Sequence, residues 1–188
     1  MMILQNQYFH VKVEEAHMNI DCLKNKIKCS HILDPKNLLQ QSFYKVLFIT
    51  VVLQDKNLQI ALICDEYSVG KQCAVLEDTA LTVLQNDMIV QLDVTNGSLV
   101  KHKDLEWFGC NFELHKLEND YLIYGEECIV RLDHELKEKW RFSGKDIFVS
   151  ASGKQSFELG HDSIKLYDFQ DNFYELDFLG QLIAMSDI

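Results

Sequence analysis

The sequence contains little that points to a membrane or to a standard metal site. Its longest purely apolar stretches, such as the two that flank Thr50, are far shorter than the roughly 20 residues of a bilayer-spanning helix. Residues 1–13 show no basic leader followed by an apolar core, and the six cysteines form no paired CxxC pattern. We therefore expect a cytoplasmic chain with reduced thiols that binds no membrane.

Catalytic signatures are also missing. The sequence has no GxSxG elbow, no phosphate-cradling loop, no HExxH zinc helix and no dinucleotide fingerprint. Cys110, His115 and Asp120 could supply a nucleophile, a base and an orienting group, so a small Cys/His hydrolase remains an alternative. Such triples arise easily by chance, and we expect a protein that is not an enzyme and needs no cofactor.

Cys22, Cys29 and His31 come closest to a metal site, because three soft or borderline ligands fall within a short stretch. A strand over residues 27–33 would place Cys29 and His31 on one face, which suits ligation and ordinary packing equally. The spacing is not a standard zinc pattern, and small buried thiols are common core residues. We therefore expect no bound metal.

Charge and size limit the remaining classes. The chain has 188 residues, of which 18 are Lys or Arg and 29 are Asp or Glu, giving a net charge of −11. This balance disfavours nucleic acid and anionic membranes, and it would attract a basic partner. With 47% hydrophobic residues the chain can form one ordinary core. We expect a single domain over 1–188, with N-terminal strands and a short helix in 1–78 and hairpin repeats in 79–188.

Short runs of β-branched and aromatic residues, separated by Asn, Asp and Gly, predict an all-β fold. The apolar runs 44–53 and 58–64 surround a polar turn, which indicates a hairpin. The only proline, Pro35, suits the first position of a short helix near 35–41 that Asp34 can cap. We expect no larger helical region.

An internal repeat is the most informative feature. Residues 80–93 (ALTVLQNDMIVQLD), 120–133 (DYLIYGEECIVRLD) and 164–177 (IKLYDFQDNFYELD) align without gaps, and each segment reads as strand, turn and strand. The alignment shares a leucine and a closing aspartate, which are Leu92, Leu132 and Leu176 and then Asp93, Asp133 and Asp177. An aspartate at a strand end can bond the following backbone, so each unit should continue into a tight turn and another strand. One departure is Asp168, which falls where the other units have Leu84 and Tyr124.

The closing aspartates are 40 and 44 residues apart, which is the range of four-stranded propeller blades. With Leu-Asp before a glycine-containing turn, residues 79–188 resemble the blades of quinoprotein-like propellers. That resemblance implies repeated antiparallel blades, although Trp140 alone stands at a plausible position of the family's tryptophan. A twisted sandwich or an open, curved sheet satisfies the same pattern.

Acidic residues recur at one turn of the repeat. The alignment places Asp87, Glu127 and Asp171 at the same position, with Glu126 beside Glu127. Because equivalent turns of stacked repeats emerge on one face, these carboxylates would concentrate negative potential and steer a basic partner. Trp107, followed by Phe108, is a candidate aromatic anchor beside acidic residues, or alternatively a core residue.

Small size, acidic charge and the lack of catalytic motifs give this chain a profile similar to that of bacterial immunity proteins, which neutralise toxins inside the cell. The resemblance implies a basic, possibly nuclease, toxin as the protein partner. From the aligned acidic turn and the neighbouring aromatic residue, we expect the partner to be bound through Asp87, Glu126, Glu127, Asp171 and Trp107. The alternative is a general propeller-like scaffold for protein interactions.

Overall fold

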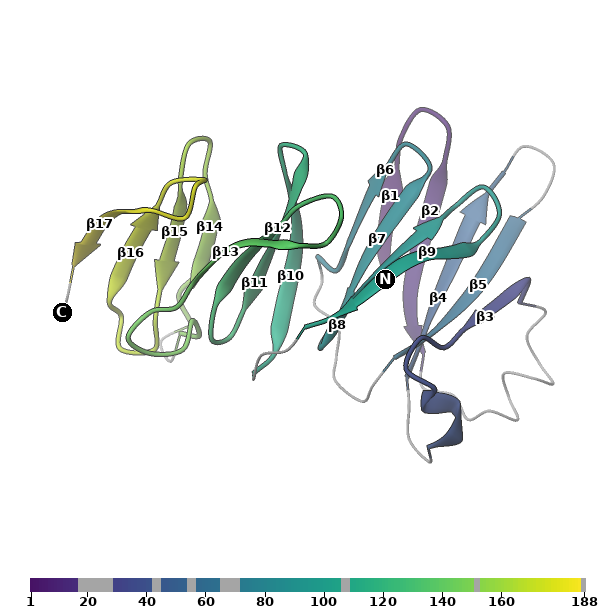
Figure 1. Ribbon diagram of the computed structural model, residues 1–188, viewed down its shortest axis with the longest axis horizontal. Coiled ribbons are helices and arrows are strands. Elements are labelled where there is room, and N and C mark those ends of the chain that lie inside the picture. The colour runs from purple at the N-terminus through teal and green to yellow at the C-terminus, as the bar shows by residue number, and fades with distance from the viewer. Residues whose placement is uncertain are drawn as a thin grey trace. The chain divides into compact units, whose positions relative to one another are not determined.

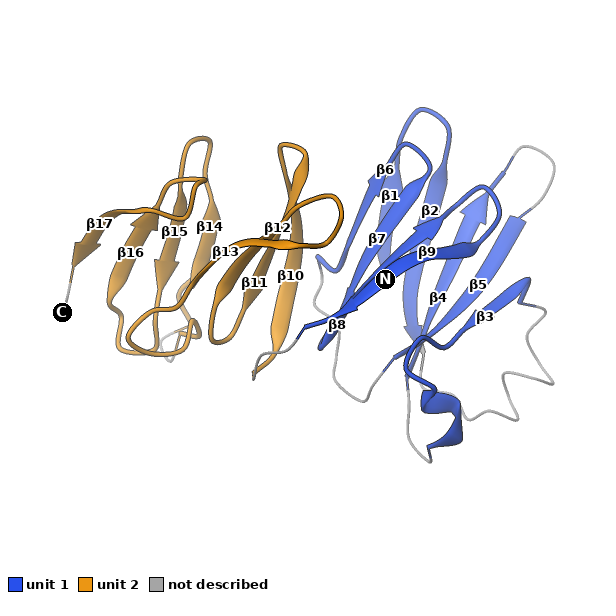
Figure 2. Cartoon of the chain, viewed as in Figure 1, with its two compact units in different colours: residues 1–106 blue, residues 107–188 orange. Residues whose placement is uncertain are grey.

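The computed structural model describes residues 1–16, 29–41, 45–53, 57–64, 72–105, 109–150 and 153–186. They form two compact units, residues 1–106 and 107–188 (Figure 2). Each unit contains two sheets built mainly from antiparallel hairpins, which confirms the predicted all-β fold (Figure 1). In these ranges no helix is long and apolar enough to cross a membrane.

The first sheet has the strand order β1-β2-β4-β5-β3. Its strands are β1 (Met2–Gln5), β2 (His10–Ala16), β3 (His31–Leu33), β4 (Lys45–Val52) and β5 (Asn57–Cys64). The predicted hairpin is confirmed, because β4 pairs antiparallel with β5 and Val52 lies opposite Asn57. β3 lies within the strand considered over residues 27–33, but the sequence pattern did not predict its partner: β3 adds to the edge of the sheet parallel to β5.

The connection from β2 to β4 carries β3 and a single-turn 3-10 helix, η1 (Leu38–Gln40). Asp34 caps this turn as predicted, since its carboxylate accepts from the backbone N–H of Leu38 at 2.8 Å. Pro35 lies in the turn before η1 instead of at its first position, because Asn37 takes a left-handed backbone with φ of 56°. Leu38 then packs on the face of the first sheet that points away from the second sheet, together with a group of β4 and β5 residues: Val46, Ala61 and Ile63.

The second sheet follows in chain order, with β6 (Ala74–Glu77), β7 (Ala80–Gln85), β8 (Met88–Asp93) and β9 (Ser98–Asp104). Its fully buried Val83 and Val90 share one hydrophobic core with Ile49 and Ile60 of the first sheet. Each such side chain contributes about 1.5–3 kcal/mol when it leaves water. This shared core joins the two sheets into the first unit.

The second unit repeats the arrangement with two four-stranded sheets. The third sheet contains β10 (Asn111–Leu117), β11 (Asp120–Gly125), β12 (Ile129–Leu132) and β13 (Glu138–Phe142). The fourth contains β14 (Phe157–Leu159), β15 (Ile164–Tyr167), β16 (Phe173–Leu176) and β17 (Leu182–Ser186). Leu122 and Tyr124 of the third sheet share a core with Leu166 of the fourth. The Tyr124 ring also stacks on Phe157, with 4.7 Å between ring centroids.

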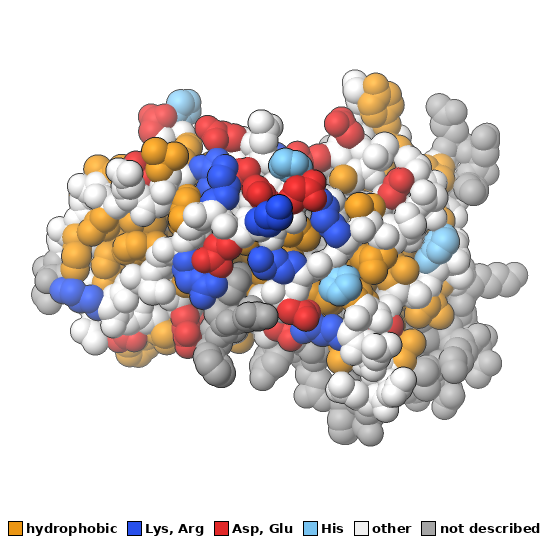
Figure 3. All heavy atoms as spheres, in the orientation of Figure 1, with side chains coloured by type: hydrophobic (Ala, Val, Ile, Leu, Met, Phe, Trp, Pro, Cys, Tyr) orange, Lys and Arg blue, Asp and Glu red, His pale blue; other side chains and the backbone are white. Residues whose placement is uncertain are grey.

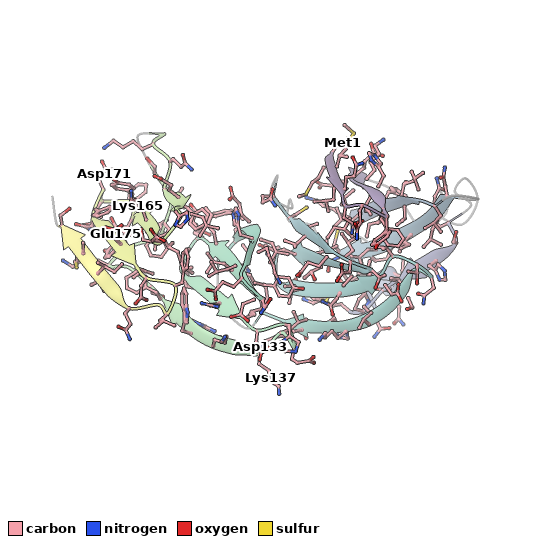
Figure 4. The ribbon with its side chains drawn as sticks, turned by 90° about the horizontal axis from the view of Figure 1, so that it is seen from above. Met1, Asp133, Lys137, Lys165, Asp171 and Glu175 are labelled. Atoms are coloured by element: carbon pink, nitrogen blue, oxygen red, sulfur yellow. The ribbon has the colours of Figure 1, made fainter. Side chains whose placement is uncertain are left out.

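The closing aspartates behave as the repeat predicted. In all three repeat segments the aspartate Oδ1 accepts the backbone N–H of the residue two positions later. The distances are 2.8 Å for Asp93, 2.9 Å for Asp133 and 2.9 Å for Asp177. Asp133 also accepts the Lys137 N–H at 2.8 Å, and both residues are labelled in Figure 4. The shared leucines, Leu92, Leu132 and Leu176, are completely buried.

The structure corrects the ungapped alignment in its third segment. Tyr124 lies opposite Ile129 across the β11–β12 turn, whereas Tyr167 lies opposite Phe173 across the β15–β16 turn, which is one residue longer. Asp168 therefore directly follows the end of β15 and begins this longer turn, instead of matching the strand residues Leu84 and Tyr124. The registers agree again from Phe173 onward, so the offset is confined to β15 and this turn.

A close contact between a ring and a glycine recurs in both units. A Cβ on Gly97 would come within 2.6 Å of the His31 ring, and one on Gly180 within 2.6 Å of the Trp140 ring. Both glycines lie in the turn after the closing aspartate and have positive φ. A side chain there is therefore disfavoured by the backbone conformation as well as by the ring. Trp140 also donates its Nε1–H to the Phe178 carbonyl at 3.1 Å.

Candidate protein-binding turns

The predicted acidic residues lie in the same turn of three successive sheets, between the second and third strands. Asp87 joins β7 to β8, Glu126 and Glu127 join β11 to β12, and Asp171 joins β15 to β16. Trp107 lies outside the described residues, so its predicted role as an anchor stays a prediction. The environments of the four carboxylates differ, and those differences decide which of them can meet a partner.

Asp87 already has a basic partner within its own unit. The Lys36 ammonium, from the turn before η1, forms an ion pair with the Asp87 carboxylate and lies 3.8 Å from Asp104. The Asp87 carbonyl also accepts the backbone N–H of Leu105 at 2.8 Å. An outside lysine or arginine would therefore have to compete with Lys36 at this turn.

The β11–β12 and β15–β16 turns of the second unit are linked by hydrogen bonds to the segment after β13. The backbone N–H of Phe148 donates to the Glu126 carbonyl at 2.6 Å, and the N–H of Phe169 donates to the Ile147 carbonyl at 2.8 Å. Consecutive residues of one segment thus bond both turns. The β11–β12 and β15–β16 turns consequently belong to one end of the second unit.

The carboxylates at this end divide into one that is used internally and two that face solvent. Glu126 is partly buried, and its Oε2 accepts the Cys110 backbone N–H at 3.0 Å. Glu127 is exposed. Asp171 keeps about a third of its side chain exposed, with the mostly exposed Lys154 ammonium 3.5 Å away. Glu127 and Asp171 are therefore the predicted residues that a partner can reach here.

Phe169 is a candidate contact that the sequence analysis missed. It lies two residues before Asp171, and 49% of its surface is exposed. Its position is fixed because its own N–H bonds the Ile147 carbonyl. An aromatic residue within the polar stretch Asp-Phe-Gln-Asp-Asn was the available signal, but the ungapped alignment did not reveal that this stretch forms an extended turn.

The buried Asp168 carboxylate stabilises the Phe169 turn through hydrogen bonds. It is completely buried and accepts from the Tyr174 hydroxyl at 2.8 Å, from the Gln170 N–H at 3.0 Å and from the Asn172 N–H and side-chain amide at 3.0 and 2.9 Å. Burial acts to raise the pKa of Asp168, but these hydrogen bonds, with those of Asn172 the strongest, outweigh it and lower the pKa below its ordinary value. The turn is thus organised before any partner binds.

The residues of the hydrolase alternative are not assembled. Cys110 precedes β10, whereas Asp120 begins β11 at the other end of the β10–β11 hairpin. His115 lies between them and bonds Glu113, with 2.7 Å between its Nε2 and the carboxylate. Asp120 accepts from Arg131 at 2.6 Å. Burial acts to raise the pKa of Asp120, but its basic neighbours lower it overall.

The candidate metal ligands are only partly within the described structure. Cys29 is partly buried before β3, His31 packs on Gly97, and Cys22 lies outside the described residues. Across the ranges that the structure describes, no three His, Cys, Asp or Glu side chains are grouped to hold a metal ion. The expectation of no bound metal therefore stays a prediction.

Comparisons with known proteins give a fold and no family. No family model and no curated protein matches the sequence. BamB from Moraxella catarrhalis is similar at 13% identity and a TM-score of 0.50, covering 84% of this chain and 48% of that chain. The Pan2 WD40 domain of Neurospora crassa has 9% identity, a TM-score of 0.48 and coverage of 62% and 37%. A Bacteroides caccae protein of unknown function has 14% identity, a TM-score of 0.46 and coverage of 77% and 63%.

At these identities the similarity concerns the fold alone. The BamB match, together with three four-stranded sheets whose strands follow in chain order, gives the chain a β-propeller-like fold, as the resemblance to quinoprotein-like blades implied. The chain spans less than two thirds of each of these three structures.

Proposed function

We propose that this chain is a protein-binding module whose propeller-like scaffold presents the Phe169 turn to a protein partner. The observation that carries the proposal is an aromatic side chain, about half exposed, on a turn that buried hydrogen bonds hold rigid. Rigid aromatic anchors dominate the energetics of many interfaces because they bury a large area with little loss of conformational freedom. No catalytic step belongs to this proposal.

The partner expected at this turn has an apolar pocket bordered by basic side chains. Phe169 would enter the pocket, while Asp171 on the same turn and Glu127 on the neighbouring turn would face the basic border. Exposed carboxylates mainly accelerate encounter and are screened by salt. The chain's net charge of −11 acts in the same direction over longer distances.

An immunity protein that neutralises a basic, possibly nuclease, toxin is the narrower form of this proposal. Its support is the acidic charge of a small chain. A reducing, cytoplasmic location, in which the cysteines would be reduced thiols, belongs to the same proposal. A general interaction scaffold has the firmer support, because it requires only the propeller-like fold and an exposed anchor.

The test compares Phe169→Ala with Leu179→Ala, which removes another exposed apolar side chain from a different turn of the same sheet. Affinity capture should first identify a partner of the unmodified chain, and association kinetics should follow. Phe169→Ala should weaken binding at least tenfold, chiefly by faster dissociation, while Leu179→Ala binds normally. Equal binding by both variants, with both folded, would remove the Phe169 turn from the proposal.

A second comparison separates the carboxylates from the anchor. The double variant Glu127→Gln, Asp171→Asn should associate several-fold more slowly at low salt and show a flatter dependence on ionic strength, with little change in dissociation. Unchanged association at every salt concentration would show that the acidic residues do not steer the partner.

A further inference from the structure

The last strand of the fourth sheet differs in charge from the strands at the same position in the preceding sheets. β9, β13 and β17 are each the fourth strand of a sheet, and within the described residues each is hydrogen-bonded on one side only. β9 has the sequence SLVKHKD and β13 has EKWRF, whereas β17 reads LIAMS. Charged side chains on an edge strand discourage pairing with another chain, and β17 has none.

The apolar side chains of β17 are also exposed. The exposed fractions are 47% for Leu182, 58% for Ile183 and 40% for Met185. Hydrophobic side chains gather over β16 and β17 in Figure 3. The backbone bulge does not distinguish this edge, because the same register shift occurs where β9 and β13 pair with their neighbours. The lack of charge is therefore what sets β17 apart.

We propose that β17 pairs antiparallel with β17 of a second copy of this chain, which continues the fourth sheet across a two-fold axis. Ala184 is the middle residue of β17, so a two-fold axis at Ala184 would place Ile183 opposite Met185 of the second copy. Every close pair across the axis is then apolar or uncharged, and no like charges meet. A two-fold contact uses the same strand on both copies, so it closes at a dimer.

The sequence of the strand argues for a second copy over an unrelated partner. With the axis at Ala184, Leu182 also lies opposite Ser186 of the second copy, so this uncharged strand is its own complement along its whole length. On β15 and β16, Lys165 lies opposite Glu175 in register, and both are labelled in Figure 4. Each copy would therefore bring one basic and one acidic side chain on these two strands. This surface shares no residue with the Phe169 turn, so it is independent of the proposed function.

Sedimentation velocity over protein concentrations from about 2 to 200 μM tests the proposal, because a single-strand contact is small and should give a weak dimer. The unmodified chain should shift toward twice its monomer mass as concentration rises. Ile183→Lys should keep the chain monomeric over this range, since its lysine would lie diagonally across from its counterpart. Val100→Lys is the matched control, because Val100 is 54% exposed at the equivalent bulge of the charged strand β9. It should dimerise like the unmodified chain.

A charge-exchange experiment then identifies the contact. Chains carrying Ile183→Lys and chains carrying Ile183→Glu should each be monomeric alone and should form dimers when mixed in equal amounts. Circular dichroism of each variant should match that of the unmodified chain. An unmodified chain that stays monomeric at about 200 μM would overturn the proposal, as would a dimer that survives Ile183→Lys or an assembly that grows beyond two copies.

Discussion

Replacing Asp168 with alanine should destabilise the second unit by about 3–5 kcal/mol, because it removes a buried, fully hydrogen-bonded carboxylate. The change leaves the Tyr174 hydroxyl and the Asn172 side-chain amide without their acceptor, and each of these groups is buried. Asp168→Asn should cost less, about 1–3 kcal/mol. The asparagine keeps one oxygen as an acceptor, but its NH2 group replaces the other oxygen and faces groups that are themselves donors.

The effect should depend on pH in a defined direction. Hydrogen bonding lowers the pKa of Asp168 in the folded chain, so the carboxylate contributes its full stabilisation above its unfolded pKa of about 3.9. That contribution disappears as the pH falls through the lower, folded pKa. The difference between the unmodified chain and Asp168→Asn should therefore be largest near neutral pH and should shrink below about pH 4.

Urea unfolding followed by circular dichroism at several pH values measures these free energies. Asp162→Ala is the matched control, because the Asp162 side chain is 89% exposed in a turn of the same sheet. It should change stability by less than about 0.5 kcal/mol. A loss at Asp168 no larger than at Asp162, or one that is the same at pH 3 and pH 7, would refute the role assigned to the buried carboxylate.

Three further results are expected. Leu132→Ala should destabilise the chain by about 2–5 kcal/mol in urea unfolding, because it truncates a completely buried repeat position. Gly180→Ala should cost more than Gly153→Ala in the same assay and should alter Trp140 fluorescence, because both glycines have positive φ but only Gly180 touches that ring. Elemental analysis should find no stoichiometric zinc in purified protein, and Cys29→Ser should be as stable as the unmodified chain; about one bound zinc per chain would contradict this.

The sequence predicted those parts of the fold that depend on local chemistry. Alternating apolar residues identified the hairpins, and Asp133 at a strand end predicted the turn that it stabilises. Two features depend on contacts that no local pattern encodes. β3 pairs parallel with β5 across 29 residues of sequence, and the extra residue in the β15–β16 turn is visible only in the strand register. An alignment without gaps could not detect that residue.

The candidate site was predictable in position and less so in composition. Counting back from the closing aspartates located the acidic turns correctly, because the third strand of each repeat segment aligns without a gap. The pairing of Asp87 with Lys36 joins residues 51 positions apart, so no spacing rule could anticipate it. Phe169 was missed for a related reason, since its position depends on how the earlier segment after β13 bonds the turn through Ile147.

The contact between a ring and a glycine gives the junction inside each unit a direction. In both units the earlier sheet contributes the ring, His31 or Trp140, and the later sheet contributes the glycine, Gly97 or Gly180. The two sheets of a unit are therefore not interchangeable, because one provides the ring and the other the space that receives it. Lengthening such a protein by duplicating a whole unit would keep each ring beside its glycine, whereas exchanging the two sheets within a unit would separate them.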